Sequence, residues 1–327
     1  MPALNFEPTR VEEDLRGLIA GDVRCDSAMA ALYASDASIY EATPLGVVRP
    51  RTVDDVVATV RYAAEHRIPL HPRGGGSSLA GGPLGPGLVV DFSRYLRRIV
   101  ADEGDAITVE AGVVLERLNR HAARRGREFG PDPPNRAVST VGGAVARDAV
   151  GSRWLACGSV HDHVRAVQAV LADGSVVRLP CGPQAAPTDD GGVAERLATG
   201  VAEIARRFAE PLQRRRAASL LDRSGDALAA AAAGPQVDLG RLLVGSHGGL
   251  ALITEATVAT VPRPAHAGVT MLLFNSLQAA AEASVELIRY PLRACDLLDR
   301  RHVSLARDLD LRYAVMIPAG VEAVLLV

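Results

Sequence analysis

The sequence contains no lysine: all 36 basic residues of the 327-residue chain are arginine. This excludes three chemistries that need a lysine amine, namely a P-loop grip on nucleotide phosphates, a Schiff base and a lysine general base. Aromatic residues make up only 4% of the chain, and the formal net charge is −2. Because nucleic-acid binding relies on a basic surface and on stacking rings, we expect no nucleic-acid partner.

Cysteine is scarce as well, and Cys25, Cys157, Cys181 and Cys295 are far apart in the sequence. Zinc and iron–sulfur sites are typically built from closely spaced pairs such as Cys-x-x-Cys, which are missing here. We therefore expect four reduced thiols that bind no metal.

A metal site is conceivable at "SVHDHV", where His161 and His163 flank Asp162. If this segment is extended, alternate side chains point to opposite faces and the two histidines cannot converge on one ion. We therefore expect no metal site in this chain.

Long apolar runs are missing too. The alanine run at 229–233 is far too short to span a bilayer, and "MPALNFEPTRVEEDL" has no apolar core of the kind that a signal peptide needs. We expect no transmembrane segment and a cytoplasmic protein, with peripheral attachment to the inner face of the membrane as the alternative.

Glycine, by contrast, is abundant and gathers in three segments, at 72–82, 130–153 and 244–254. Each combines glycines and small hydroxyl residues with a neighbouring apolar strand. A segment of this kind can be a bulged turn, or it can present backbone N–H groups to a nucleotide pyrophosphate where no Cβ keeps the ligand away. The repetition of the pattern favours the phosphate site.

A Rossmann NAD site is not predicted. Its fingerprint, G-x-G-x-x-G/A at the start of a helix, is not matched by Gly74-x-Gly76, which is followed three residues later by Leu79. Gly142 and Gly143 are followed directly by alanine and do not match it either.

The order of the predicted elements indicates an α+β protein. Strand, helix and strand follow one another over 46–73, a hairpin turn is expected at Asp173-Gly174, and helical patterns fill 193–230. The closing "YAVMIPAGVEAVLLV" ends on an apolar strand that would leave a sticky, exposed edge. We therefore expect the polypeptide to continue beyond Val327.

Four stretches together resemble a known family: "VVRPRTVDDVVATVRYAAEHRIPLHPRGGGSSLAGG", "FGPDPPNRAVSTVGGAVARDAVGSRWLACGSVHDHV", "LADGSVV" and "VGSHGGLALITEATVATVPRP". They are similar to FAD-linked oxidases and dehydrogenases of the vanillyl-alcohol-oxidase superfamily. Within it they most resemble the glycolate oxidase and D-lactate dehydrogenase branch, which includes long fusions of an FAD part with an iron–sulfur part. The match covers roughly residues 30 to 327.

The resemblance implies an α+β fold with a PCMH-type FAD-binding domain at 41–263, made of subdomains at about 41–100 and 101–263. A helical segment, 1–40, would precede it. Residues 264–327 would begin an α+β cap domain for substrate, apparently truncated.

The resemblance also implies FAD as the cofactor and assigns residues to it. The assigned groups cradle the pyrophosphate, line the ribityl chain and isoalloxazine, or offer a backbone contact to the flavin nucleotide. They are, in that order, Arg73, Gly74, Gly75, Gly76, Ser77 and Ser78; Pro131, Asp132, Thr140, Gly142 and Gly143; and Ile253.

The sequence departs from the family pattern at two of these motifs. Arg147-Asp148 stands where relatives often have Asn-Asn, and His247 replaces an acidic residue. His247 would either tune the flavin or make an ordinary polar loop contact. No histidine follows the first glycine segment at the position used for covalent flavin attachment in some relatives, so we expect non-covalent FAD.

The reaction implied by the resemblance is oxidation of a D-2-hydroxy acid, such as D-lactate or glycolate, to the 2-keto acid by hydride transfer to flavin N5. In this branch the histidine base and the metal-binding histidines lie in the C-terminal half, so we name no catalytic residue and expect this chain alone to be inactive. An iron–sulfur cluster is expected only in a missing C-terminal region or a partner, either of which could accept the electrons.

Three alternatives stay open. The chain could be a non-catalytic FAD-binding subunit of a larger flavoenzyme, or a flavin reductase that uses NAD(P)H, although no nicotinamide fingerprint is present. The arginine-rich segment 297–312 could meet a substrate carboxylate, but a solvated helix face is the favoured interpretation.

Overall fold

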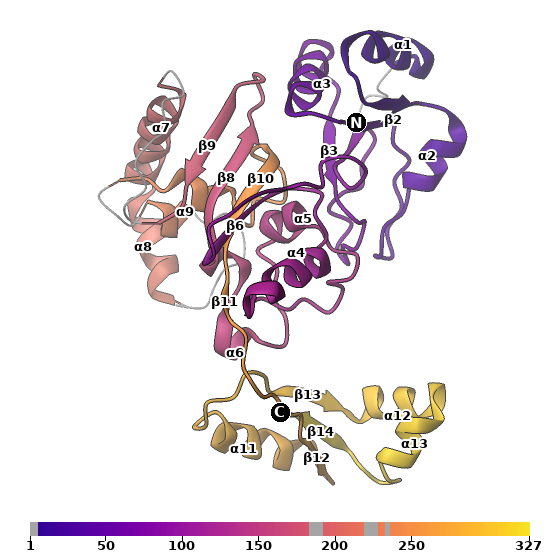
Figure 1. The fold of residues 1–327 in the computed structure, drawn as a ribbon, viewed down its shortest axis with the longest axis vertical. Coiled ribbons are helices and arrows are strands. Elements are labelled where there is room, and N and C mark those ends of the chain that lie inside the picture. Colours follow the sequence, from indigo (N-terminus) through magenta and orange to yellow (C-terminus); the bar gives the residue numbers. More distant parts are fainter. Residues whose placement is uncertain (1–5, 183–191, 219–227, 233–235) are drawn as a thin grey trace.

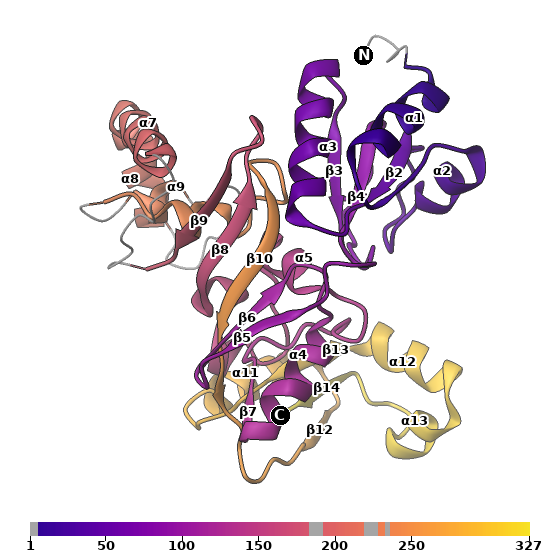
Figure 2. The ribbon, with the colours of Figure 1, turned by 45° about the horizontal axis from the view of Figure 1, so that its top comes forward.

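The structure is a computed structural model that describes residues 6–182, 192–218, 228–232 and 236–327. Two lobes, each built on its own sheet, lie side by side, and a smaller third unit lies at one end (Figure 1; Figure 2). This confirms the α+β fold class expected from the sequence.

The first lobe has a four-stranded sheet in the order β1-β2-β4-β3, in which β2 and β3 run parallel to β4 and β1 runs antiparallel to β2. Helix α3 connects the parallel strands β2 and β3. Thr52 caps its first turn, and Arg67, at φ 56°, ends it in the left-handed conformation. The elements are α1 (Pro8–Leu18), β1 (Asp22–Arg24), α2 (Ser27–Tyr33), β2 (Gly46–Arg49), α3 (Val53–His66), β3 (Leu70–Arg73) and β4 (Leu88–Asp91).

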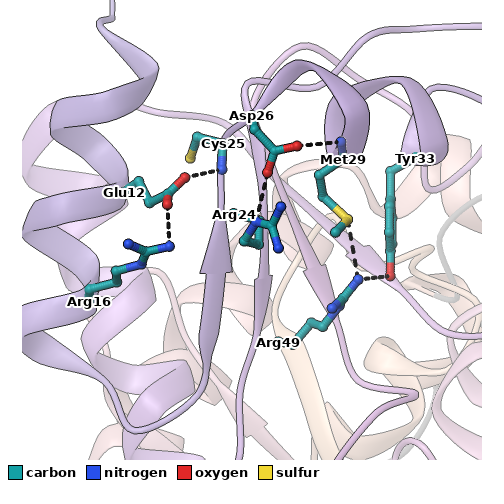
Figure 3. Close-up of polar contacts among 8 residues, drawn as sticks. All are labelled: Glu12, Arg16, Arg24, Cys25, Asp26, Met29, Tyr33 and Arg49. Carbon is teal, nitrogen blue, oxygen red and sulfur yellow. Dashed lines mark hydrogen bonds and ion pairs between the residues drawn. The ribbon is translucent and has the colours of Figure 1, made fainter.

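The N-terminal segment is tied to this lobe by polar contacts (Figure 3). Glu12, on α1, accepts a hydrogen bond from the backbone N–H of Cys25 at 2.5 Å and pairs with Arg16. Arg49, on β2, donates to the Tyr33 hydroxyl at 3.4 Å and to the sulfur of Met29. Within the segment expected to be helical, residues 6–40 supply the edge strand β1 as well as the helices α1 and α2.

The second lobe has a five-stranded antiparallel sheet in the order β5-β6-β10-β8-β9. The predicted hairpin at Asp173-Gly174 joins β8 to β9, and Gly174 has φ 82°, a conformation in which glycine costs nothing. The strands are β5 (Ile99–Asp102), β6 (Ala106–Glu110), β8 (Val164–Val170), β9 (Val176–Pro180) and β10 (Leu252–Ala259).

Short helices accompany this sheet, and its largest apolar core includes Phe129, Leu115 and Leu118. The remaining elements of the lobe are α4 (Leu115–Ala122), η1 (Ala123–Arg125), β7 (Arg127–Glu128), α5 (Val141–Ala146), α6 (Trp154–Cys157), η2 (Val160–Asp162), α7 (Val193–Arg207), α8 (Ala209–Ala218), α9 (Leu228–Ala231), α10 (Leu239–Leu243) and β11 (Val261–Pro262). Part of the predicted helical stretch, residues 219–227, lies outside the described residues.

A separate apolar cluster joins the two lobes. Val56 and Val90 of the first lobe pack with Ala111, Val170 and Leu252 of the second. Because these apolar side chains exclude water, they stabilise the interface between the two lobes. The glycine-rich segments lie next to this interface.

The third unit is a three-stranded sheet in the order β12-β14-β13 with helices packed on it. The sequence predicted that the closing strand would be an exposed edge, which is wrong. The strand β14 lies in the centre of the sheet with Ala323, Val324 and Leu325 fully buried, and residues 311–316 are helical. The elements are β12 (Met271–Phe274), α11 (Leu277–Leu287), β13 (Asp296–Asp299), α12 (Arg300–Leu309), α13 (Leu311–Met316) and β14 (Ala323–Leu326).

No helix in the described ranges combines the length and the apolar character that a membrane span requires.

Candidate functional site

The three glycine-rich segments converge on one cleft at the junction of the two lobes. The empty space between its walls is about 760 Å³ when the open mouth is included. The lining residues are Pro72, Arg73, Gly74, Gly75, Gly76, Ser77, Ser78, Gly82, Pro83, Phe92, Ala111, Ser139, Thr140, Gly142, Gly143, Ala146, Arg147, His247, Gly248, Ala251 and Ile253.

The first segment leaves the carboxyl end of the parallel strand β3 and packs directly on the second. A Cβ on Gly74 would overlap the Thr140 hydroxyl, and a Cβ on Gly75 would overlap the carbonyl oxygen of Val138. Gly76 has φ 66°, and its carbonyl accepts a hydrogen bond from the N–H of Ala37 at 3.0 Å. Glycine is therefore required here by the close approach of two backbones as well as by the local turn.

The charges and donors of the cleft suit an anion. Its lining includes Arg73, Arg147 and His247, and the described lining residues include no aspartate or glutamate. Within the described part of the chain, the backbone N–H groups of residues 74–78 have no hydrogen-bond acceptor. Such N–H groups beside two guanidinium groups form a site for phosphate oxygens.

Arg73 is held in place by an aromatic ring rather than by an acid. Its guanidinium lies 4.9 Å from the centre of the Tyr33 ring and donates to the Tyr33 carbonyl oxygen at 3.3 Å. Tyr33 in turn donates its hydroxyl proton to Asp91 at 2.6 Å, and burial together with Asp91 raises the pKa of this phenol. The phenol therefore stays neutral at neutral pH. Arg73 packs on its ring and lines the cleft.

The side-chain amide of Asn135 bridges the first and second segments. The side chain of Asn135 donates to the carbonyl oxygen of Ser77 at 3.1 Å and accepts from the Ser139 hydroxyl at 2.8 Å. The hydroxyl groups of Ser77 and Ser139 are also 3.0 Å apart. Asn135 thus closes a hydrogen-bonded triangle behind the cleft wall.

Replacing Asn135 by alanine is expected to weaken FAD binding by up to about thirtyfold, because two part-buried hydrogen bonds worth about 1 kcal/mol each are lost. The measurement is fluorescence titration with FAD. Asn275→Ala, at an exposed position in the third unit, is the matched control and should leave the affinity unchanged. Equal affinities for the two variants would contradict the role given to Asn135.

The second and third segments are joined backbone to backbone. The N–H groups of Gly245 and His247 donate to the last carbonyl oxygens of α5, those of Val145 and Ala146, at 3.0 and 2.7 Å. The bond to Ala146 pairs a carbonyl at the end of the helix, whereas the carbonyl oxygen of Val145 also accepts the N–H of Asp148 at 3.1 Å. His247 is exposed, has φ 55° and is among the residues that line the cleft.

Asp148, one of the departures from the family pattern, has a structural role. It has φ 47°, a conformation that aspartate and asparagine share, and its carboxylate accepts the N–H of His161 at 2.7 Å. The adjacent Arg147 lines the cleft.

Ten of the twelve predicted site residues line the cleft, and Pro131 and Asp132 do not. Pro131 is buried, and the Asp132 carboxylate is paired with Arg136 at 3.0 Å and Arg153 at 3.4 Å. Contact of these two residues with a cofactor stays a prediction. Phe92 and Ala111 were not anticipated from the sequence, because each stands outside the quoted motifs and reaches the cleft only through the fold. Ser139 lies within the second segment but was not singled out as a site residue.

The residues around His161 form a short 3-10 turn rather than the extended segment assumed from the sequence. His163 is buried, and its Nε2 lies 2.8 Å from the carbonyl oxygen of Cys157. In the described ranges, no cluster of three or more histidine, cysteine or acidic side chains is placed to hold a metal ion.

The cysteines in the two lobes differ in environment. Burial raises the pKa of Cys25 to about 11 and that of Cys181 to about 12. At pH 8 the folded chain is expected to react with iodoacetamide about a hundredfold more slowly than the unfolded chain at Cys25 and about a thousandfold more slowly at Cys181, because the thiolate is the nucleophile. Mass spectrometry after timed quenching measures this, and equal labelling rates in buffer and in urea would contradict it.

The arginine-rich segment 297–312 does not reach the cleft. Arg312 pairs with Asp310, and Arg307 donates to the carbonyl oxygen of Pro318. No residue of the third unit is among the described lining residues. The contacts of Arg312 and Arg307 are typical of a solvated helix face, the interpretation favoured from the sequence.

Comparisons with known proteins agree with this geometry. Residues 44–180 match the family described as "FAD binding domain". Glycolate oxidase subunit GlcD of Bacillus subtilis (strain 168) is 29% identical over 303 residues, which cover 90% of this chain and 54% of that protein. D-2-hydroxyglutarate dehydrogenase of Escherichia coli (strain K12) is 30% identical over 305 residues, which cover 88% of this chain and 29% of that protein.

D-lactate dehydrogenase of Archaeoglobus fulgidus is also similar, at 29% identity over 81% of this chain and 49% of that protein. The chain thus spans about half, or less, of the length of these relatives. The solved structure of an alkyldihydroxyacetonephosphate synthase superposes with a TM-score of 0.67 over 98% of this chain and 55% of that one, at 16% identity. This last likeness supports the fold alone, and together the comparisons confirm the resemblance stated from the sequence.

Proposed function

Since residues 44–180 belong to the FAD binding domain family, we propose that this chain binds FAD in the cleft between its two lobes. The observation that carries the proposal is the convergence of three glycine-rich segments on a cleft with unpaired N–H groups and two arginines. A dinucleotide pyrophosphate is the chemical group that matches such a lining.

The residues of the first segment, with Arg73, would hold the pyrophosphate. Apolar contacts for the less charged parts of the cofactor would come from Phe92, Ala251 and Ile253, which line the same cleft. Arg147 brings a second positive charge to the cleft and could stabilise negative charge on a bound flavin, and His247 lines the same cleft. We assign the cofactor a non-covalent attachment, and this also rests on the resemblance.

We further propose that the chain belongs to an enzyme that oxidises a D-2-hydroxy acid such as D-lactate or glycolate. FAD, when bound, supplies the acceptor for the hydride of the substrate α-carbon. The cleft residues of this chain bind and orient the cofactor and shield it from water. In this proposal, the base that takes the hydroxyl proton and the electron acceptor come from outside the residues described here.

The absorption spectrum of the purified chain, before and after acid precipitation, tests the cofactor. We expect two flavin bands that pass into the supernatant as FAD. A colourless protein that stays colourless with added FAD would contradict FAD binding, and a flavin that stays with the precipitate would contradict non-covalent attachment.

A second candidate is a non-catalytic FAD-binding subunit, which is favoured by the similarity to a protein named as a glycolate oxidase subunit. Anaerobic addition of D-lactate or glycolate to the FAD-loaded chain separates the two. Bleaching of the flavin in the chain alone would contradict the placement of the base outside these residues, whereas bleaching only in the presence of a partner chain supports the subunit. Bleaching by NADH alone would instead support a flavin reductase.

A further inference from the structure

The third unit is joined to the second lobe through a buried carboxylate. Glu128 lies on β7, which pairs with β11 just before the third unit begins. Its side chain is only 11% exposed and is paired with Arg293 of the third unit and, at 3.0 Å, with Arg153 of the second lobe. A carboxylate this deeply buried needs such partners, because removing one leaves an uncompensated charge.

Arg153 also contacts a residue nearer to the cleft. Arg153 is shared, since its Nε lies 3.4 Å from the carboxylate of Asp132, and Asp132 is paired in turn with Arg136 at 3.0 Å. A continuous series of ion pairs therefore connects the third unit to Arg136.

The end of this series adjoins the clamp behind the cleft wall. Asn135, next to Arg136, carries the amide that joins Ser77 to Ser139, and the carbonyl oxygen of Asn135 also accepts the N–H groups of Val138 and Ser139. A shift of the turn that contains Asp132 and Arg136 would therefore shift Ser77 and Ser139, which line the cleft.

We propose that Arg153 is a positioning residue that couples the docking of the third unit to the shape of the cleft, through the series Arg293, Glu128, Arg153, Asp132 and Arg136. The effect on FAD rests on the proposed function, whereas the mechanical coupling does not. Because coupling between two sites is reciprocal, docking strengthens FAD binding and FAD strengthens docking by the same factor.

A double-mutant cycle on the full chain tests the coupling. Arg293→Gln and Asp132→Asn are each expected to raise the Kd for FAD by about fivefold. The double variant should stay within about twofold of the weaker-binding single variant, because both changes interrupt one series. Arg289→Gln, which removes only the exposed pair with Glu286 in the third unit, is the matched control and should leave the Kd unchanged.

Hydrogen exchange without FAD gives a readout that is independent of the cofactor. In Arg293→Gln, the amides of Val138 and Ser139 should exchange faster than in the unsubstituted chain and in Arg289→Gln. Unchanged exchange, or single effects on the Kd that simply multiply in the double variant, would overturn the proposal. If the amides of Val138 and Ser139 exchange faster in Arg293→Gln but the unsubstituted chain binds no FAD, the mechanical coupling is supported and the proposed cofactor is contradicted.

Discussion

Alanine at position 75 is expected to raise the Kd for FAD by about tenfold to a hundredfold. The new Cβ would overlap the carbonyl oxygen of Val138, which belongs to backbone and cannot rotate away. The first and second glycine-rich segments must then separate, and overpacking of this kind costs about 1–3 kcal/mol. Because residues of both segments line one cleft, the loss appears in binding.

Fluorescence titration with FAD measures the effect, and far-ultraviolet circular dichroism checks the fold. Gly17→Ala is the control, since a Cβ there has open space around it and glycine inside a helix costs about 0.5–1 kcal/mol. This variant should bind FAD normally and be slightly more stable. Normal affinity in Gly75→Ala would show that the two segments do not need their close contact.

Phe129→Ala is expected to lower the free energy of unfolding by about 3–5 kcal/mol, the usual cost of emptying a large buried aromatic site. Phe129 is 1% exposed and meets the ring of His163 edge to face, with ring centres 5.7 Å apart. It also lies between Glu128 and the buried Pro131, so the cavity would loosen the junction with the third unit.

Urea unfolding monitored by circular dichroism measures this loss. Phe208→Ala is the matched control, because that ring is 48% exposed and its removal should cost less than about 1 kcal/mol. A loss in Phe129→Ala no larger than that of the control would contradict the central place given to this ring in the core.

Much of the architecture could be predicted because its signals are local. The alternation of strand and helix around α3 follows from an apolar stripe, a threonine N-cap and a left-handed C-cap residue. The hairpin at Asp173-Gly174 follows from the turn itself. The first glycine segment could be expected to line a ligand cleft, and it does line one, because clustered glycines beside a strand allow close approach to the backbone.

Other features could not be foreseen because they depend on what each residue meets. The closing strand was expected at an edge, but whether an apolar strand is central depends on its neighbours, here β12 and β13. The turn at His161 was taken as extended, yet a reciprocal cap between Ser159 and Asp162 makes it a 3-10 turn. Asn135 carried no signal, because an asparagine in a loop is ordinary until two serines lie beside it.

Backbone freedom and strand patterning are properties of the local chain, so the class of fold, the three glycine-rich segments and their likeness to FAD-binding proteins could be foreseen. The folded chain alone shows that Gly74 and Gly75 are needed for contact between segments, that Asp132 is paired with Arg136 and Arg153, and that Glu128 joins the third unit to the second lobe. These are contacts between residues distant in the chain. Their energies depend on distance and burial, which no short stretch of sequence contains.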